Sequence, residues 1–251
     1  IFQDKWYSLP YLADVLVYIY RHDLFTRMGI APPENIAQLY EVAQQMTGDS
    51  VYGLAFPANP DDLVTSVWSY FLWSYGGDYF TDDGHPLINS AESVAATRIY
   101  TLILENCAPA VVATWKAEEA VDFFLGGNLA AMILWSSTIP VINNSGKKAF
   151  GEVGVAPLPL GPVGDAISPL ISWGIVIPRS AKHIIAAKKF AVTLASMESL
   201  STIAKELMVP TPLPKVNRAS ATENPEKQLS IVTAALEKGK AWPPFPFLDS
   251  H

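Results

Sequence analysis

Hydrophobic and polar positions along the chain follow two periods, one typical of strands and one typical of helices. Runs of β-forming residues predict strands at 14–20, 51–57, 129–135 and 152–159. Apolar positions three or four residues apart predict helices after Asn35 and Asn89, over 61–75, around 117–124, over 136–144, around 187–194 and 197–207, and over 224–238. Strands that alternate with helices predict an α/β fold.

Capping residues mark the ends of two of these helices. Asn35 precedes the first, and Gln38 follows three residues later, which is the spacing of a capping box; Gly48 ends that helix. Asn224-Pro225 pairs a capping residue with a first-turn proline and is expected to open the last helix.

The segment "LISWGIVIP", 170–178, predicts one more strand, and a buried one, because its aliphatic residues are strong β-formers. Trp173 and Gly174 interrupt it. Glycine inside a strand often marks a place where another group approaches the backbone closely. The pair therefore raises the question of what needs an aromatic ring beside bare backbone.

Composition limits what the chain can be. Half of the 251 residues are hydrophobic and 16% are charged, which is typical of a globular protein of one large domain or two small ones. No apolar run approaches the roughly 18–20 residues of a membrane span. The net charge of −7 argues against nucleic acid or an anionic membrane as a partner.

None of the short motifs of common catalytic or cofactor sites is present. The sequence has no GxSxG, GxxxxGK[ST] or HExxH pattern, and its four histidines lack metal-ligand spacing. The acidic stretch 78–86 misses the calcium-loop spacing and favours a turn at Asp83-Gly84. The single cysteine, Cys107, is interpreted as an inert buried thiol. We therefore expect no cofactor and no metal.

Aromatic residues stand out instead, with 7 Trp and 10 Tyr in a chain of few charges. Trp68 and Trp73 fall inside the apolar helix 61–75 and are expected in the core. Trp135 and Trp173 differ, because each lies where a strand meets a polar or glycine-bearing connection. Ligands collect at the ends of strands in α/β folds, so these two are candidate binding residues. The alternative for Trp173 is a core residue that happens to precede a glycine.

Polar groups beside Trp135 strengthen its candidacy. The chain continues into Ser136 and Ser137, whose hydroxyls and neighbouring helix N–H groups can bind ligand oxygens. An aromatic face beside polar groups suits a sugar, since the ring meets polarised C–H groups while the polar groups bind hydroxyls. Asp14 is either an exposed residue where a strand begins or a bidentate acceptor for two hydroxyls, because burying an unpaired carboxylate is costly.

Seven stretches together resemble the extracellular solute-binding proteins of sugar ABC transporters, the family that includes the maltose- and trehalose-binding proteins. The similarity lies in their order and spacing over nearly the whole chain. The stretches are "LPYLADVLVYIYRHDLF" (9–25), "APPENIAQLYEVAQQMT" (31–47), "FLWSYGGDYFTDDGHPLINSAESVAA" (71–96), "AVDFFLGGNLAAMILWSST" (120–138), "VGVAPLPLGPVG" (153–164), "SWGIVIPRSAKHIIAAKKF" (172–190) and "AWPPFPF" (241–247).

The resemblance implies a type II periplasmic-binding-protein-like fold, in which two α/β lobes close on a ligand. It implies a near-complete lobe over 12–160, and a hinge passage and the C-terminal part of the second lobe over 161–251. The Pro- and Gly-rich loop 159–169 is the boundary. The residues that it implies for ligand binding are Tyr11, Asp14, Trp135, Ser136, Ser137, Trp173, Gly174 and Trp242.

Two departures from the family pattern matter. A first segment and further C-terminal helices of the family have no counterpart, so the chain resembles a fragment with one lobe partial. Where many relatives have Arg-Pro, this chain has Trp242-Pro243, which puts a charged contact there in doubt and makes an aromatic one available.

The function that the resemblance implies is the capture of a mono- or oligosaccharide and its delivery to a membrane permease, without chemistry. It implies a periplasmic or extracellular location, and lipid anchoring through an absent N-terminal segment is compatible with it. A polyol or glycerol phosphate is the alternative ligand, and a sensor ectodomain would share the fold. A carbohydrate-active enzyme is disfavoured, because glycoside hydrolysis needs two facing carboxylates, and the adjacent acids at 118–119 and 82–83 do not face each other.

Overall fold

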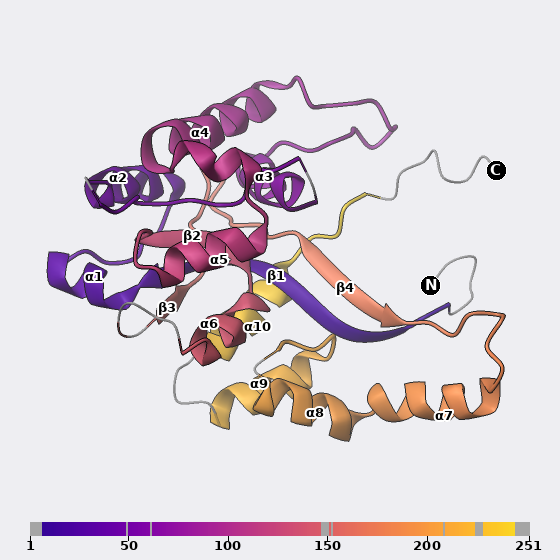
Figure 1. Cartoon of the computed structure of the whole chain (residues 1–251). Helices are drawn as coiled ribbons and strands as arrows, with labels where there is room; N and C mark the ends of the chain where they lie inside the picture. Colours follow the sequence, from indigo (N-terminus) through magenta and orange to yellow (C-terminus); the bar gives the residue numbers. More distant parts are fainter. Residues whose placement is uncertain are drawn as a thin grey trace.

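The computed structural model describes residues 7–48, 50–60, 62–146, 151, 153–207, 209–223 and 228–243. Helices and strands alternate along the chain, as an α/β fold requires (Figure 1). In chain order they are β1 (Leu9–Arg21), α1 (His22–Met28), α2 (Ile36–Met46), α3 (Asp62–Ser74), α4 (Ala91–Cys107), the 3-10 helix Ala110–Thr114, α5 (Ala117–Leu125), β2 (Ala131–Trp135), α6 (Thr138–Asn144), β3 (Val153–Ala156), β4 (Leu170–Ile175), α7 (Ile184–Leu194), α8 (Met197–Glu206), α9 (Pro214–Glu223) and α10 (Gln228–Lys238).

Strand β1 belongs to two sheets at once. Its C-terminal half lies between β2 and β3, and its N-terminal half pairs with β4, with all three pairings antiparallel. The change of partner falls between Val15, which pairs with Leu170, and Leu16, which pairs with Trp135. In Figure 1, β1 and β4 run side by side out of the main body toward α7. The strand therefore connects two parts of the molecule.

The larger part is built around the C-terminal half of β1. Figure 1 shows α2, α3 and α4 on one side of the sheet and α6 and α10 on the other. Residues 15–19 of β1 and 129–134 at β2 are buried in one continuous apolar core. Helix α10 belongs to this core, since Val232 is buried in it and Leu236 packs against it. The C-terminal part of the chain thus returns to the larger unit after the predicted boundary at 161.

The smaller part consists of the N-terminal half of β1, β4 and helices α7 to α9. Its core of buried residues is small and contains Leu200, Ala204 and Val216. In α7 only Ala191 is buried, and Phe190, which the periodicity placed on the covered face, is exposed. Among the residues described, this part of the molecule therefore leaves apolar side chains of α7 exposed.

Most predicted elements are present, and three differences have physical causes. The segment 51–57 forms isolated bridges beside β2 instead of a strand, because the chain bends at Gly53, which lies against the backbone of Ala43. Helix α4 starts one residue later than expected, because the side chain of Ser90 caps it. The predicted buried strand at 170–177 is wrong in its burial, since every residue of β4 is half-buried or exposed and β1 is its one paired strand within the described residues. The predicted cap Asn224-Pro225 lies outside the described residues.

Candidate functional site

A pocket of about 310 Å³ lies where β1 changes partners. It is bounded by β1, the end of β2, β4 and the segment before α9. Its lining residues are Leu12, Ala13, Asp14, Trp135, Ser137, Ile171, Trp173 and Val209. Four of the eight residues proposed from the sequence, Asp14, Trp135, Ser137 and Trp173, therefore meet in one cavity, although up to 159 positions separate them.

Two larger hollows have no buried polar group among the described residues that line them. One, of about 590 Å³, lies against the outer face of α4, and another, of about 580 Å³, lies beside the start of α7. Every residue that lines them is exposed or half-buried. The pocket at β1 differs because a buried carboxylate opens into it, and buried polar groups that face a cavity are typical of ligand sites.

Asp14 is the polar centre of the pocket. Its side chain is buried, so the interpretation as an exposed residue at the start of a strand is wrong. Oδ1 accepts hydrogen bonds from the backbone N–H of Val15 (3.0 Å), the backbone N–H of Ser137 (3.1 Å) and the hydroxyl of Ser136 (2.5 Å). These donors satisfy a carboxylate that would otherwise be costly to bury.

Burial also shifts the pKa of this carboxyl. Desolvation raises the pKa of Asp14 above its ordinary value, and the hydrogen bonds from Ser136, Ser137 and Val15 oppose that rise. No charged neighbour contributes to the shift. The Asp14 carboxylate is therefore stabilised by neutral donors alone, and it offers an acceptor to a ligand without a competing cation.

The two indole rings form apolar walls of the pocket. Trp135 ends β2 and is half-buried, whereas Trp173 lies on β4 opposite Leu12 and is 61% exposed. The interpretation of Trp173 as a core residue is therefore wrong. An exposed ring at the mouth of a pocket has a face to which a ligand can bind.

The other four proposed residues lie outside the pocket lining. Ser136 is fully buried behind Asp14, and Tyr11 packs against the small core of Leu200. Trp242 donates its indole N–H to the Ser69 hydroxyl on α3 (3.0 Å). Direct contact of these three with a ligand in this pocket finds no support in the geometry.

Gly174 lies against the segment that precedes β1. A Cβ atom at this position would lie 2.8 Å from the side chain of Ser8, which precedes β1. The close approach that the glycine permits is thus between two strands of the same chain. No ligand is needed to explain it.

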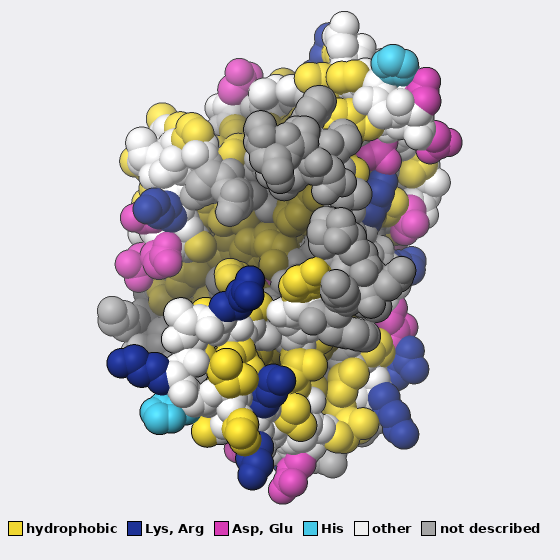
Figure 2. All heavy atoms as spheres, turned by 90° about the vertical axis from the view of Figure 1, so that its right-hand side faces the viewer, with side chains coloured by type: hydrophobic (Ala, Val, Ile, Leu, Met, Phe, Trp, Pro, Cys, Tyr) yellow, Lys and Arg dark blue, Asp and Glu magenta, His cyan; other side chains and the backbone are white. Residues whose placement is uncertain are grey.

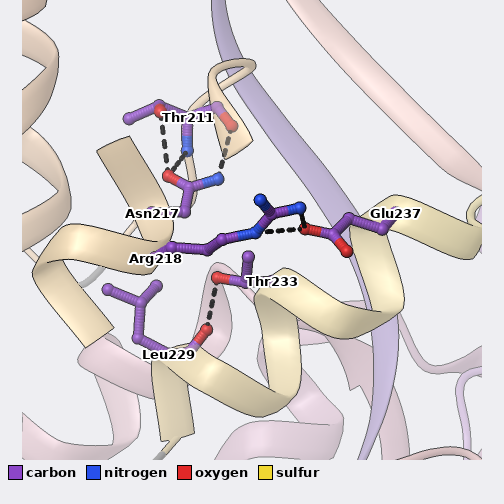
Figure 3. A network of polar contacts seen from close by, with 6 residues as sticks. All are labelled: Thr211, Asn217, Arg218, Leu229, Thr233 and Glu237. Carbon is purple, nitrogen blue, oxygen red and sulfur yellow. Dashed lines mark hydrogen bonds and ion pairs between the residues drawn. The ribbon is translucent and has the colours of Figure 1, made fainter. Parts of the chain in front are cut away.

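Sequence reasoning missed the wall formed by Val209. The segment that carries it is tied to β1 by a hydrogen bond from the Ala13 N–H to the Pro210 carbonyl (3.2 Å). Buried Asn217 holds the same segment through three hydrogen bonds of 2.8–2.9 Å to Thr211 (Figure 3). The proline-rich "VPTPLP" signalled a loop but gave no indication of its partner.

On the side of the molecule toward which β4 and α7 extend, Figure 2 shows a hollow with hydrophobic side chains deep inside it. Hydrophobic side chains are also exposed below the hollow, among Lys and Arg residues. Within the described residues, no group of three or more His, Cys, Asp or Glu side chains could hold a metal ion. No described helix is both long and apolar enough to cross a bilayer.

Comparison with known families agrees with this architecture. The model of the bacterial extracellular solute-binding protein family matches residues 1–200. The chain belongs to this family. Its fold is also that of a maltose-bound protein of T. maritima, with a TM-score of 0.86 and 24% identity over 95% of this chain and 62% of that one. The two-lobed α/β fold, with one lobe partial, is thereby confirmed.

Two curated relatives are similar in sequence. A "Probable ABC transporter-binding protein" of Deinococcus radiodurans is 27% identical over 71% of this chain and 44% of its own length. The mannitol-binding protein of Pseudomonas aeruginosa is 26% identical over 76% of this chain and 45% of its own length. The chain thus spans about half the length of the curated relatives it matches, and these relatives are named as binding proteins.

Proposed function

We propose that this chain is part of the solute-binding component of an ABC transporter and that its pocket at β1 holds a neutral sugar or polyol. One observation carries the proposal: a buried carboxylate, held by neutral donors, lines one cavity together with two indole rings. The carboxylate accepts hydrogen bonds from ligand hydroxyls, and the rings pack against the C–H face of the same ligand.

The lining of the pocket favours a neutral ligand over glycerol phosphate. No Lys, Arg or His is among the eight described residues that line it. A phosphate needs cationic or multiple N–H donors, and a buried carboxylate would repel it. The names of two relatives agree, since one is a mannitol-binding protein and one structure contains maltose.

We further propose that the protein returns its ligand unchanged. Glycoside hydrolysis needs two carboxyl groups on either side of the bond, and the pocket lining contains one, Asp14. The natural partner is then a membrane permease that receives the ligand, and the protein acts in the periplasm or outside the cell. Lipid anchoring through an N-terminal segment is part of the same proposal.

Titration calorimetry with maltose, D-mannitol and sn-glycerol 3-phosphate tests this function. We expect heat of binding with at least one neutral ligand, none with the phosphate, and loss of binding in Asp14→Asn. Chromatography of the recovered sugar should show no product. Preferential binding of glycerol phosphate, or binding of maltose unaffected by Asp14→Asn, would contradict the proposal.

A further inference from the structure

Ser136 occupies an unusual position for a polar residue of a binding site. It follows directly on Trp135, one of the pocket walls, yet its side chain has no exposed surface. Its backbone N–H donates to the Val15 carbonyl (2.8 Å), and its hydroxyl donates to Asp14. The residue therefore joins the end of β2 to the point of β1 that carries the carboxylate.

We propose that Ser136 is a positioning residue, which never touches the ligand but holds Asp14 charged and oriented toward it. This inference rests on the proposed function, because it assigns the role to the same pocket. It differs from the expectation drawn from the sequence, in which the Ser136 hydroxyl itself bound the ligand.

The orientation follows from the geometry at one oxygen. The N–H groups of Val15 and Ser137 and the hydroxyl of Ser136 all donate to Oδ1 of Asp14. Donors from β1 and from the turn after β2 fix the plane of the carboxylate, since rotation about its last bond would break them together. The Ser137 hydroxyl is a further donor to the same carboxylate. The second carboxylate oxygen takes part in none of these three bonds. The carboxylate is thus held in one orientation at the cavity that Asp14 lines.

The negative charge of Asp14 depends on the same donors, because no cation among the described lining residues compensates it. Around the cavity, β2 and the turn after it contribute Trp135 and Ser137, β4 contributes Ile171 and Trp173, and the segment before α9 contributes Val209. None of these five side chains is cationic or titrates near neutrality. No charged group of the described residues, those of α7 and α10 on β1 included, shifts the pKa of Asp14.

Removal of the Ser136 hydroxyl should therefore change both the titration of Asp14 and the binding. The pKa of the carboxyl should move further upward, because desolvation then acts against one donor fewer, and the Ser136 hydroxyl is the first of the donors that lower this pKa. Sugar binding should weaken by roughly tenfold at neutral pH, the usual effect of losing one hydrogen bond to a charged group. As the pH is lowered, sugar binding should begin to be lost at a higher pH than in the unmodified chain.

A carbon-13 NMR titration of the Asp14 carboxyl in the 251-residue chain tests the coupling without any ligand. Ser136→Ala should raise the titration midpoint of Asp14, and Ser136→Thr, which keeps the hydroxyl, should restore it. Ser93→Ala is the matched control. Ser93, on α4, is equally buried, but its hydroxyl donates to the Leu87 carbonyl (3.0 Å) and not to Asp14. If Ser136→Ala does not fold, Ser136→Cys, a weaker donor, replaces it.

Calorimetry with maltose and D-mannitol over pH 4–8 is the second readout. A raised midpoint together with a binding loss that sets in at higher pH, both reversed in Ser136→Thr, supports the proposal. If the titration midpoint of Asp14 is the same with and without the Ser136 hydroxyl, the proposal is overturned, regardless of the result for sugar binding. If the midpoint moves but neither ligand binds the unmodified chain, the coupling stands and the proposed function fails.

Discussion

Trp173 shows how burial decides between two roles for one residue. From the sequence, its ring was either a core residue before a glycine or a platform at the edge of a cleft. The structure leaves 61% of the residue exposed while its side chain lines the pocket with Asp14. An exposed ring contributes little to the core, so its size is better explained by something that binds to it.

We predict that Trp173→Ala leaves the fold intact but weakens maltose binding. Its free energy of unfolding should change by about 0.5 kcal/mol or less, as for other exposed positions. The free energy of maltose binding should become less favourable by about 1–3 kcal/mol, which is typical of the loss of an aromatic contact at a binding site. Trp73→Ala is the control, since Trp73 is buried and its loss should cost about 3–5 kcal/mol of stability. A large fall in melting temperature with unchanged affinity would contradict the platform role.

Asp14 should make the stability of the protein depend on pH. Because burial raises its pKa in the folded state, its stabilising contribution is complete below the ordinary value of 3.8 and is lost as the pH rises through the raised pKa. Asp14→Asn keeps an oxygen for the three donors and removes the buried charge. We therefore expect it to melt at a higher temperature than the unmodified chain at pH 7, with the difference shrinking toward pH 4.

Asp82→Asn, on the exposed turn between α3 and α4, controls for the loss of one negative charge. Calorimetric melting of both variants across this pH range is the measurement. An Asp14→Asn protein that melts below the unmodified chain at pH 7 would show that the buried charge is not a cost to the fold.

How far the site could be predicted also differs from residue to residue. Asp14, Trp135 and Trp173 could be proposed because a charge inside an apolar run and aromatic residues at strand ends are visible in the sequence. Val209 and the buried role of Ser136 could not, because they depend on which distant segment lies beside β1. That pairing is set by register across up to 195 positions, which local patterns do not contain.

Among the elements, those fixed by local chemistry were predicted best. Helix α2 starts where Asn35 accepts from the Gln38 N–H (3.0 Å), as the capping spacing predicts. Helix α9 was not predicted, because the prolines of 210–214 obscure its start, although Pro214 is tolerated as its first residue. The N-terminal extension of β1 was missed as well, since β4 is its partner and Pro10 weakens the strand pattern.

Helix α9 holds one wall of the pocket in place through Asn217. Asn217→Ala removes all three hydrogen bonds to buried Thr211 and should cost about 1–3 kcal/mol of stability. It should also weaken sugar binding, since the same segment carries Val209 into the pocket. Chemical denaturation and calorimetry measure the two effects.

Arg218→Ala is the control from the neighbouring position. Arg218 pairs with Glu237 on α10, and both side chains are largely exposed (Figure 3). Exposed ion pairs contribute less than about 1 kcal/mol, so this variant should keep its stability and its affinity. If the two variants behave alike, the Asn217 network does not position the pocket wall.

At the scale of the whole molecule, the two parts differ strongly in how much apolar surface they bury. The larger part has a continuous core from α2 to α10, whereas among the described residues the buried core of the smaller part contains three. Around that small core, Ile185, Phe190 and Val192 of α7 remain exposed. Local stability follows buried apolar contacts, so the parts should open separately.

Native-state hydrogen exchange should therefore divide the C-terminal part of the chain in two. Amides of α7 and α8 should exchange faster than those of β1 to β3, because α7 is covered at Ala191 alone. Helix α10 should be as protected as the sheet, since it packs on β1 and β3 despite following α7 to α9 in the chain. This internal comparison separates weak packing from simple proximity to the C-terminus. Equal protection of α7 and α10 in a demonstrated monomer would mean that the small core is sufficient to keep α7 folded. Slow exchange of α7 only at high protein concentration would mean that a second copy covers its exposed apolar side chains.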